Sequence, residues 1–372
     1  MSRRIRDWLI LWRLPGIGPA TFAKAVEAFG DPQAVLQAGE DALCRAGLPA
    51  ECARAIAQAD PALADPDLRW LDAAPHHHVL TWDDPRYPSR LREVPGAPPL
   101  LYVNGDPEWL RMPQLAVVGS RSPTPAGEAN AREFARELAA AGLTITSGLA
   151  LGIDAAAHGG ALEGGGATIA VTATGPDRVY PARHRALAHA ITAQGAVVTE
   201  FPLGTGPRRA HFPRRNRMIS ALAMGTLVVE AGLRSGALIT ARLAAEQGRE
   251  VFAIPGSIHN PMARGCHRLI RQGAKLVETA ADILEELAPL LDTPTLYPPE
   301  AEAPAGGPSS LPTDPEHREL LEAMGHDPVS VDELVQRTGL TVEAVSSMLL
   351  ILELEGRVGM AGDGRYHRLN AT

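Results

Sequence analysis

The sequence predicts an α/β protein built on a doubly wound parallel sheet, and two patterns support this fold class. Short apolar runs rich in β-branched residues recur between residues 115 and 277, and most are separated by Ala-rich segments with helical spacing, such as Gly127–Ala141 and Ala237–Gln247. Strands buried on both faces have continuous apolar sequences, and their alternation with helices indicates parallel connections. The predicted strands are Leu115–Val118, Leu143–Thr146, Thr168–Thr172, Ala196–Glu200, Thr226–Glu230, Val251–Ile254 and Lys275–Val277.

The segments on either side of this alternating region differ from it in composition. The first 75 residues are Ala-rich and predict a helical domain, in which the turn Pro15–Pro19 separates helices at Trp8–Leu14 and Thr21–Phe29. The stretch up to residue 111 is rich in Pro and aromatic residues and predicts an extension of the sheet domain. Eight prolines between residues 289 and 315 indicate a linker, which precedes a helical block with two short strands. The predicted segments are residues 1–75, 76–288, 289–315 and 316–372.

Charge is distributed unevenly along the chain. The 372 residues carry a net charge of −8, from 35 Lys and Arg against 43 Asp and Glu. Residues 112–277 alone contain 18 basic and 10 acidic side chains, a balance of +8, which leaves 17 basic and 33 acidic side chains elsewhere. A basic middle in an acidic chain indicates a polyanionic partner for that middle part.

Several classes of protein are excluded by what the sequence lacks. No apolar run reaches 18 residues, and the short apolar run near the N-terminus is interrupted by Arg13 and lacks a small-residue cleavage site. We therefore expect a cytoplasmic protein without a membrane span. The three cysteines form no CxxC pair, which argues against a zinc site or a disulfide framework. Neither Lys24 nor Lys275 stands in a Gly-Lys-Ser/Thr motif, which excludes a P-loop ATPase.

Two further patterns resemble catalytic or cofactor sites, but we interpret them otherwise. Asp154 and His158 lie four residues apart on a predicted helix. Without a third ligand or a nucleophile, capping and hydrogen bonding explain them better than metal or acid–base chemistry. The glycines of residues 159–166 end a predicted helix instead of opening one, so a nicotinamide cofactor is rejected. We expect no catalytic residue, no metal ion and no cofactor.

The loops after the predicted strands contain Gly, Ser and Arg. In a doubly wound sheet, ligands bind at the carboxyl ends of the strands, where these loops lie. Glycine allows close backbone approach to a phosphate, serine adds a hydroxyl group, and a following helix offers free amide groups to an anion. Ordinary strand-to-helix turns also favour these residues, and that alternative stays open. The candidate binding residues are Gly119, Ser120, Arg121, Ser147, Gly148, Arg234, Ser235 and Gly236.

A second signal is the run of residues 207–217, in which five arginines fall within ten positions. Arginine side chains grip phosphate and an aromatic ring stacks on a base, as in proteins that bind single-stranded nucleic acid. A solvated charged loop is the alternative. The run follows a predicted strand and precedes a helix expected to start near Arg214, which favours the ligand edge. The candidates are Arg208, Arg209, Phe212, Arg214, Arg215, Asn216 and Arg217.

Five motifs in this order resemble the DprA (Smf) DNA-processing family over about residues 80–280. Together they are highly specific, although each alone is short. They are Val117–Arg121, Ser147–His158, Phe212–Ile219, Ser235–Thr240 and Val251–Gly256.

This resemblance implies an extended Rossmann-like core in a cytoplasmic protein that binds single-stranded DNA. Members of the family protect incoming DNA and help to load the RecA recombinase during natural transformation, as dimers and without catalytic turnover. After Tyr180-Pro181 the family often carries Lys and then Asn, whereas this chain has Ala182, Arg183 and His184. We therefore assign Arg183 to the place of the lysine. The phosphate-binding set implied by the motifs is Gly119, Ser120, Arg121, Ser147, Gly148, Arg214, Asn216, Arg217, Ser235 and Gly236.

The flanking domains also resemble parts of the family. The turn Leu14–Gly18 is similar to a helix-hairpin-helix of a SAM-like domain, and both phosphate binding and a purely structural cap remain open for it. The last block resembles a winged helix, with helices at Val331–Thr338 and Thr341–Leu354 and a wing at Gly362–Gly364. The predicted recognition helix has glutamates and no basic residue, so phosphate repulsion opposes docking. We expect a protein-contact or auxiliary module.

An alternative from a different class is a nucleotide-binding hydrolase of the same Rossmann-like superfamily. Such enzymes use a Gly-Gly-x-Gly-Thr run beside catalytic acids, and Glu230 stands near the corresponding place. This chain instead has Arg234 in the segment Glu230–Gly236, and its arginine run suits several phosphates better than one. Binding of single-stranded DNA is the favoured interpretation.

Overall fold

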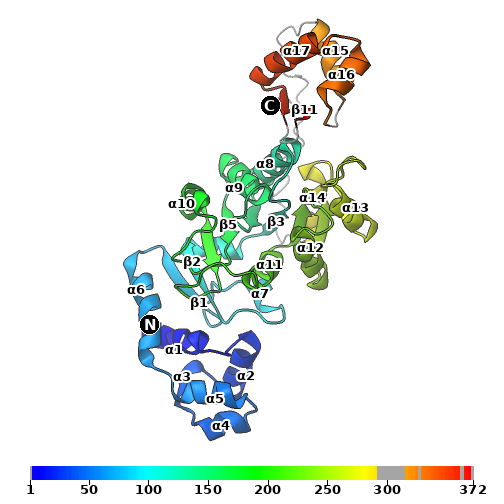
Figure 1. The fold of residues 1–372 in the computed structure, drawn as a ribbon. Coiled ribbons are helices and arrows are strands. Elements are labelled where there is room, and N and C mark those ends of the chain that lie inside the picture. The colour runs from blue at the N-terminus through cyan, green and yellow to red at the C-terminus, as the bar shows by residue number, and fades with distance from the viewer. Residues whose placement is uncertain (1, 291–314, 326–327, 361–363, 370–372) are drawn as a thin grey trace.

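A nine-stranded sheet forms the centre of the protein in a computed structural model that describes residues 2–290, 315–325, 328–360 and 364–369 (Figure 1). Its strand order is β1-β2-β6-β5-β4-β3-β7-β8-β9. The seven strands from β3 to β9 pair in parallel, whereas β1 pairs with β2, and β2 with β6, in antiparallel fashion. The strands are β1 (His77–Thr81), β2 (Leu100–Gly105), β3 (Gln114–Val118), β4 (Thr144–Ser147), β5 (Thr168–Val171), β6 (Ala196–Thr199), β7 (Gly225–Val228), β8 (Glu250–Ala253) and β9 (Lys275–Leu276).

The order of the strands reverses next to β3. From β3 the chain moves through β4, β5 and β6 on one side, and it then returns to β7, β8 and β9 on the other side. A reversal of this kind opens a crevice at the carboxyl ends of the two central strands. The expected doubly wound parallel core is confirmed, and the predicted extension supplies an antiparallel edge made of β1 and β2.

All seven predicted strands are present, with ends that differ by one or two residues. The strand predicted to end at Glu230 ends at Val228, because Val228 pairs with Val118 and Ala253, the last residues of both neighbouring strands. Glu200 likewise lies just beyond β6. The helix expected near Arg214 begins earlier, and α11 spans His211–Leu222. Part of the expected arginine-rich loop is therefore helical.

Helices cover both faces of the sheet. On one face, α8 (Pro125–Ala140), α9 (Ile153–Glu163) and α14 (Ala280–Leu287) pack over β3 and β7. The axes of α8 and α9 come close at Gly160, where an added Cβ would lie 2.0 Å from the carbonyl oxygen of Arg132. The opposite face is covered by α7 (Ser89–Arg92), α11, α12 (Ala237–Glu246) and α13 (Arg264–Arg271). The remaining helix, α10 (Arg185–Gln194), packs beside β5 and β6.

The N-terminal residues form a bundle of short helices. They are α1 (Ser2–Arg13), α2 (Pro19–Phe29), α3 (Pro32–Gln37), α4 (Glu40–Arg45), α5 (Ala50–Ala57) and α6 (Asp65–Ala73). Their core contains Trp8 and Phe22, whose rings are stacked 5.2 Å apart. The same core includes Val79, Leu100 and Tyr102 from β1 and β2, so it crosses the boundary predicted at residue 75. The predicted domain limits stay predictions.

The C-terminal block has the predicted winged-helix architecture. It consists of α15 (Pro315–Met324), α16 (Val331–Thr338), α17 (Val342–Leu354), β10 (Val358–Met360) and β11 (Tyr366–Arg368), around its own hydrophobic core. Of the predicted wing, residues 362 and 363 lie outside the described residues, as do residues 291–314 of the predicted linker. Within the described residues, no helix is long and apolar enough to cross a membrane.

Candidate nucleic-acid interface

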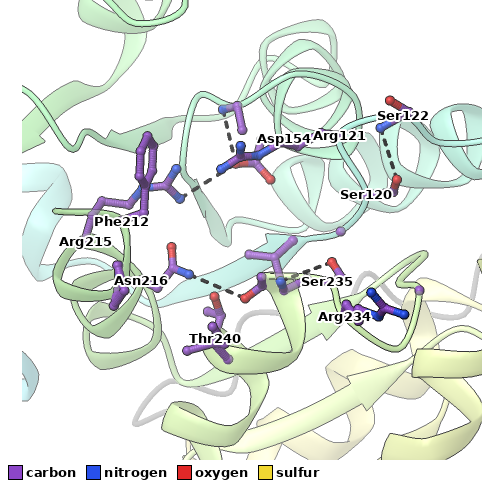
Figure 2. Close-up of a pocket in the computed structure, with 18 of the residues that line it drawn as sticks. Ser120, Arg121, Ser122, Asp154, Phe212, Arg215, Asn216, Arg234, Ser235 and Thr240 are labelled. Carbon is purple, nitrogen blue, oxygen red and sulfur yellow. Dashed lines mark hydrogen bonds and ion pairs between the residues drawn. The ribbon is translucent and has the colours of Figure 1, made fainter. Parts of the chain in front are cut away.

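A cleft of about 640 Å³ lies at the carboxyl ends of β3 and β7, where the strand order reverses (Figure 2). The loop after β3, the first turns of α11 and the loop after β7 form its walls. We call this space the cleft. Of the predicted binding residues, those that line it are Gly119, Ser120, Arg121, Arg209, Phe212, Arg215, Asn216, Arg234, Ser235 and Gly236.

Arginine and aromatic side chains meet at the rim of the cleft. The guanidinium carbon of Arg121 lies 5.3 Å from the centre of the Phe212 ring, which is a cation–π distance. The Phe212 ring lies 6.3 Å from that of Tyr180, at an angle of 57°. Tyr180 is 49% exposed and borders a smaller cavity that Arg121 and Phe212 also line. The exposed Tyr180 ring, beside the half-buried Phe212 ring and the Arg121 cation, offers a surface on which a nucleobase can stack.

The floor of the cleft contains a buried ion pair. Nη1 of Arg215 lies 3.9 Å from Oδ2 of Asp154, and both side chains are 7% exposed. Burial raises the pKa of the Asp154 carboxyl, and the Arg215 charge opposes this rise. Burial also lowers the pKa of Arg215. The Asp154 carboxylate accepts a hydrogen bond from the amide of Ala150, so the expected hydrogen-bonding role is present. The expected capping is not, because the N-cap of α9 is Gly152 and no side chain caps it. The pairing with Arg215 is an addition to the prediction.

Glycines near the cleft make room for different neighbours. At Gly148, an added Cβ would lie 1.7 Å from Nη1 of Arg215, so this glycine is needed for the buried guanidinium. At Gly119, the Cβ would lie 2.6 Å from Cγ1 of Ile153. Only at Gly236, of these three, would an added Cβ meet nothing within 4 Å, at the open N-terminus of α12. Phosphate contact at these glycines stays a prediction.

Backbone strain occurs next to the cleft at Leu149. Its φ is 59°, a left-handed conformation that side chains with a Cβ rarely adopt. Leu149 is fully buried, and its carbonyl accepts a hydrogen bond from Nδ1 of His184 at 3.0 Å. Strain held by the surrounding structure is typical of functional sites.

Serine and asparagine side chains fix the loops around the cleft. Oγ of Ser120 accepts from the amide of Ser122 at 3.1 Å, and Oγ of Ser235 accepts from the amide of Ala237 at 3.3 Å. Nδ2 of Asn216 donates to the carbonyl of Gly236 at 3.4 Å, which joins α11 to the start of α12. These three polar residues therefore order the walls of the cleft.

The five arginines of residues 208–217 divide into two groups. Arg214 Nη2 lies 2.7 Å from the buried Glu200 carboxylate, Arg217 lies 3.8 Å from it, and Arg215 pairs with Asp154. Arg208 and Arg209 are exposed and form no ion pair with the residues that the structure describes. The sequence presented one cationic run, whereas the fold leaves two of its arginines unneutralised.

Some predicted binding residues line neither the cleft nor the smaller cavity. Ser147 is buried, and its hydroxyl donates to the carbonyl of Val117 at 2.6 Å, which joins β4 to β3. Arg183 is exposed on a 3₁₀ turn at Ala182–His184. Gly148 lines the smaller cavity only. The residues outside both cavities are Ser147, Arg183, Arg208, Arg214 and Arg217.

Sequence reasoning missed several residues of the site. Asp154 and Thr240 lie inside two of the motifs, in the first turns of α9 and α12, and Tyr180 lies in the loop after β5, so their closeness to strand ends was the available signal. The Glu230 carboxylate accepts hydrogen bonds from the amide of Thr124 at 2.9 Å and from its hydroxyl at 2.7 Å, so it caps the N-terminus of α8. Within the described residues, no three His, Cys, Asp or Glu side chains are grouped as metal ligands.

Fold, cleft and flanking domains together define a three-domain Rossmann-type protein with a cationic cleft at the switch point of its sheet. The family model for DNA recombination-mediator protein A matches residues 78–288. A DprA winged helix domain model matches residues 300–364, and a DprA-like N-terminal HHH domain model matches residues 2–60. The chain belongs to the DprA (Smf) family of DNA-processing proteins, as its motifs indicated.

Relatives from several bacteria support this assignment. Protein Smf of Escherichia coli (strain K12) is 46% identical over 309 residues, which cover 81% of this chain and 80% of that protein. DNA processing protein DprA of Streptococcus pneumoniae (strain ATCC BAA-255 / R6) is 46% identical over 203 residues, or 55% of this chain and 72% of that protein.

Two solved structures are similar to this fold. The X-ray structure of DprA from Streptococcus pneumoniae matches with a TM-score of 0.67 and 37% identity, over 76% of this chain and 97% of that one. The structure of DNA processing protein A from Helicobacter pylori matches with a TM-score of 0.52 and 29% identity, over 57% of this chain and 97% of that one.

Proposed function

We propose that the cleft binds single-stranded DNA. The observation that carries this proposal is the composition of the cleft, where Arg121, Arg209, Arg215 and Arg234 face a single carboxylate, that of Asp154. The aromatic cluster at the rim adds stacking surface for unpaired bases. The structure of the Helicobacter pylori relative is described as giving insights into a single-stranded DNA binding mode, which supports the same function here.

The proposal includes a preference for single strands over duplex DNA. The cleft offers turns, hydroxyl groups and guanidinium groups at strand ends, and the helices α11 and α12 contribute only their first turns to its concave wall, which does not suit insertion into a groove. Affinity for a labelled oligo-dT of about 20 nucleotides should therefore exceed that for a blunt duplex of equal length, and it should fall steeply with salt. Fluorescence anisotropy at several salt concentrations measures both. Equal or tighter binding of the duplex at moderate salt would contradict the proposal.

In the cell, we propose that the protein acts as a recombination mediator in the cytoplasm. It would protect incoming single strands during natural transformation and help RecA to load onto them, as a homodimer. The description of its family as DNA recombination-mediator proteins supports this role. RecA nucleation on DNA coated with a single-strand-binding protein, with and without this chain, tests the loading. Light scattering after size-exclusion chromatography tests the dimer.

We propose that the protein is not an enzyme. The Glu230 carboxylate, the acid that a nucleotide hydrolase would use, is engaged by both polar groups of Thr124. The pure protein should therefore release no free base from nucleoside monophosphates, which chromatography of the reaction mixture measures. Release of base that Glu230→Gln abolishes would favour the hydrolase instead.

A further inference from the structure

The segment that follows β6 is tied directly to the N-terminal domain. The indole Nε1 of Trp12, at the end of α1, donates a hydrogen bond to the carbonyl of Glu200 at 2.8 Å. Trp12 is 6% exposed, and its ring packs against Phe22 at 6.3 Å between ring centres. The bond joins residues 188 positions apart, so it connects the helical domain to the ligand edge of the sheet.

A second attachment lies next to the first. Asp67 of α6 is fully buried and accepts two hydrogen bonds from the guanidinium of Arg13. The same guanidinium donates to the carbonyl of Leu203 at 3.2 Å, and the amide of Leu203 donates to Asp67 at 3.4 Å. Both backbone groups of Leu203 are therefore held by side chains of the N-terminal domain. We call Trp12, Arg13 and Asp67 the latch.

The latch fixes the base of the segment that carries the unneutralised arginines. On its other side, Asp177 accepts from the amide of Gly204 at 3.0 Å, and Thr205 accepts from the amide of Gly175 at 2.9 Å. Residues 207–210, which lead to the start of α11, are exposed, and Arg209 among them lines the cleft. The direction in which this short segment leaves Thr205 thus decides where Arg209 lies.

The latch also reaches the first turns of α11. Glu200, whose carbonyl Trp12 holds, grips the side chains of Arg214 and Arg217 through its carboxylate. The next residue, Phe201, also contacts α11. Its ring stacks on that of His211, with 4.2 Å between the ring centres, and the guanidinium carbon of Arg214 lies 4.9 Å from the centre of the Phe201 ring. Phe212, at the rim of the cleft, belongs to the same turn. Both ends of the arginine segment therefore depend on residues next to the latch.

The helix-hairpin-helix-like turn offers less for direct contact with DNA. The amide of Ile17 bonds to the carbonyl of Leu14, and the amide of Gly18 bonds to that of Gly16. Nζ of Lys24, near this turn in sequence, bonds to the carbonyl of Gly47 at 2.6 Å. These groups are occupied within the domain.

We propose that the N-terminal domain serves DNA binding by positioning the Arg208–Arg209 segment, with Trp12, Arg13 and Asp67 as positioning residues. This inference rests on the proposed single-stranded DNA site. A segment held in its bound geometry loses less conformational freedom on binding, so the latch increases affinity without touching DNA. The opposite rim, which carries Arg234 after β7, forms no hydrogen bond or ion pair with the latch among the described residues and serves as the internal control.

The test is a pair of double-mutant cycles in the full-length protein, read as affinity for labelled oligo-dT. Trp12→Phe removes the indole N–H and keeps an aromatic ring, and it should weaken binding about fivefold. In an Arg209→Ala background the same change should cost less than about twofold, because the arginine that the latch positions is absent. In an Arg234→Ala background the full fivefold loss should persist. Both cycles are repeated with Arg13→Met, which removes the guanidinium and keeps the aliphatic part of the side chain. Thermal unfolding identifies the variants that remain folded, and only these are compared.

The outcomes separate the inference from the proposed site. If the latch substitution lowers the affinity for oligo-dT by the same factor in the Arg209→Ala and Arg234→Ala backgrounds, the positioning role is wrong, even where each arginine variant weakens binding. A Lys24→Ala variant that lowers the salt dependence of binding would also overturn it, since the domain would then contact phosphate directly. If Arg209→Ala and Arg234→Ala both leave binding intact, the proposed site itself fails.

Discussion

The arginines around the cleft occupy two contrasting environments. Arg214, Arg215 and Arg217, the inner arginines, pair with the buried carboxylates of Glu200 and Asp154. The outer arginines, Arg121, Arg209 and Arg234, are exposed and form no ion pair with the described residues. The contrast teaches that a count of cations in a sequence overstates the number of phosphate contacts. We expect the inner group to support the fold and the outer group to bind DNA.

The largest effect is expected for the inner pair. Asp154→Ala leaves the buried Arg215 without its partner, which should lower the free energy of unfolding by about 3–5 kcal/mol. Chemical denaturation monitored by circular dichroism measures this change. Arg136→Ala, which removes an exposed arginine of α8, is the control and should change stability by less than ~0.5 kcal/mol. If Asp154→Ala lowers the free energy of unfolding by less than about 1 kcal/mol, the distinction between inner and outer arginines is wrong.

The next effect concerns the outer arginines. The triple variant Arg121→Ala, Arg209→Ala, Arg234→Ala should bind oligo-dT about 100-fold more weakly, or about 2.7 kcal/mol. Three lost phosphate contacts should reduce the slope of log affinity against log salt by about two units.

Unfolding of this triple variant should match the wild type within ~0.5 kcal/mol, because the three side chains are exposed. A matched triple variant, Arg132→Ala, Arg136→Ala, Arg242→Ala, lies outside the cleft and should retain both affinity and slope. Unchanged binding in the outer triple variant would place the DNA elsewhere.

The sequence predicts the environment of an arginine when the residues that determine it are close in the chain, and it does not when they are far apart. Arg121 and Arg234 follow strands whose apolar runs are unmistakable, so their place at the ligand edge could be predicted. The pairing of Arg215 with Asp154 joins residues 61 positions apart, and nothing local in the sequence indicates it. The start of α11 at His211 was also missed, because the first turns of this helix carry no apolar periodicity that marks where it begins. Since the helix sets the direction of each side chain, Arg214 and Arg217 turn to Glu200.

A pH effect of intermediate size should belong to the interior below the cleft. His158 is fully buried in α9, one turn beyond Asp154, and desolvation lowers its pKa to about 3. The unfolded chain binds this proton near pH 6.5, so the stabilising contribution is complete above that pH and is lost as the pH falls toward 3. At pH 5.5 the loss should be about 1.4 kcal/mol.

Denaturation at pH 7.5 and pH 5.5 measures the difference, and His158→Asn should reduce it by that amount. Nδ1 of His158 bonds to the Thr168 hydroxyl at 2.6 Å, and an asparagine amide can take over this bond. An identical pH dependence in the variant would show that other groups account for the acid sensitivity.

The smallest effect is expected from the C-terminal domain. Its helix α17 has exposed Glu343 and Glu353 and exposed Leu350 and Leu354, and the exposed Glu355 follows the helix directly. These carboxylates repel phosphate. A chain that ends at residue 290 should bind oligo-dT within about threefold of the full protein, or ~0.65 kcal/mol. Titrations of both chains in the same buffer measure this. A tenfold loss, with the shortened chain still folded, would add this domain to the DNA-binding surface.

The shared core of the N-terminal helices and the sheet edge also has a consequence for how the chain is made. Trp8 and Phe22 leave the ribosome early, but their core is completed by Leu100 and Tyr102 of β2. Domains fold from the N-terminus as synthesis proceeds. The apolar surface of the helical bundle is therefore fully covered only when the chain has been made up to Tyr102, which is 29 residues beyond Ala73 at the end of α6. Until then the nascent chain exposes apolar surface of the kind that makes incompletely folded chains prone to aggregation.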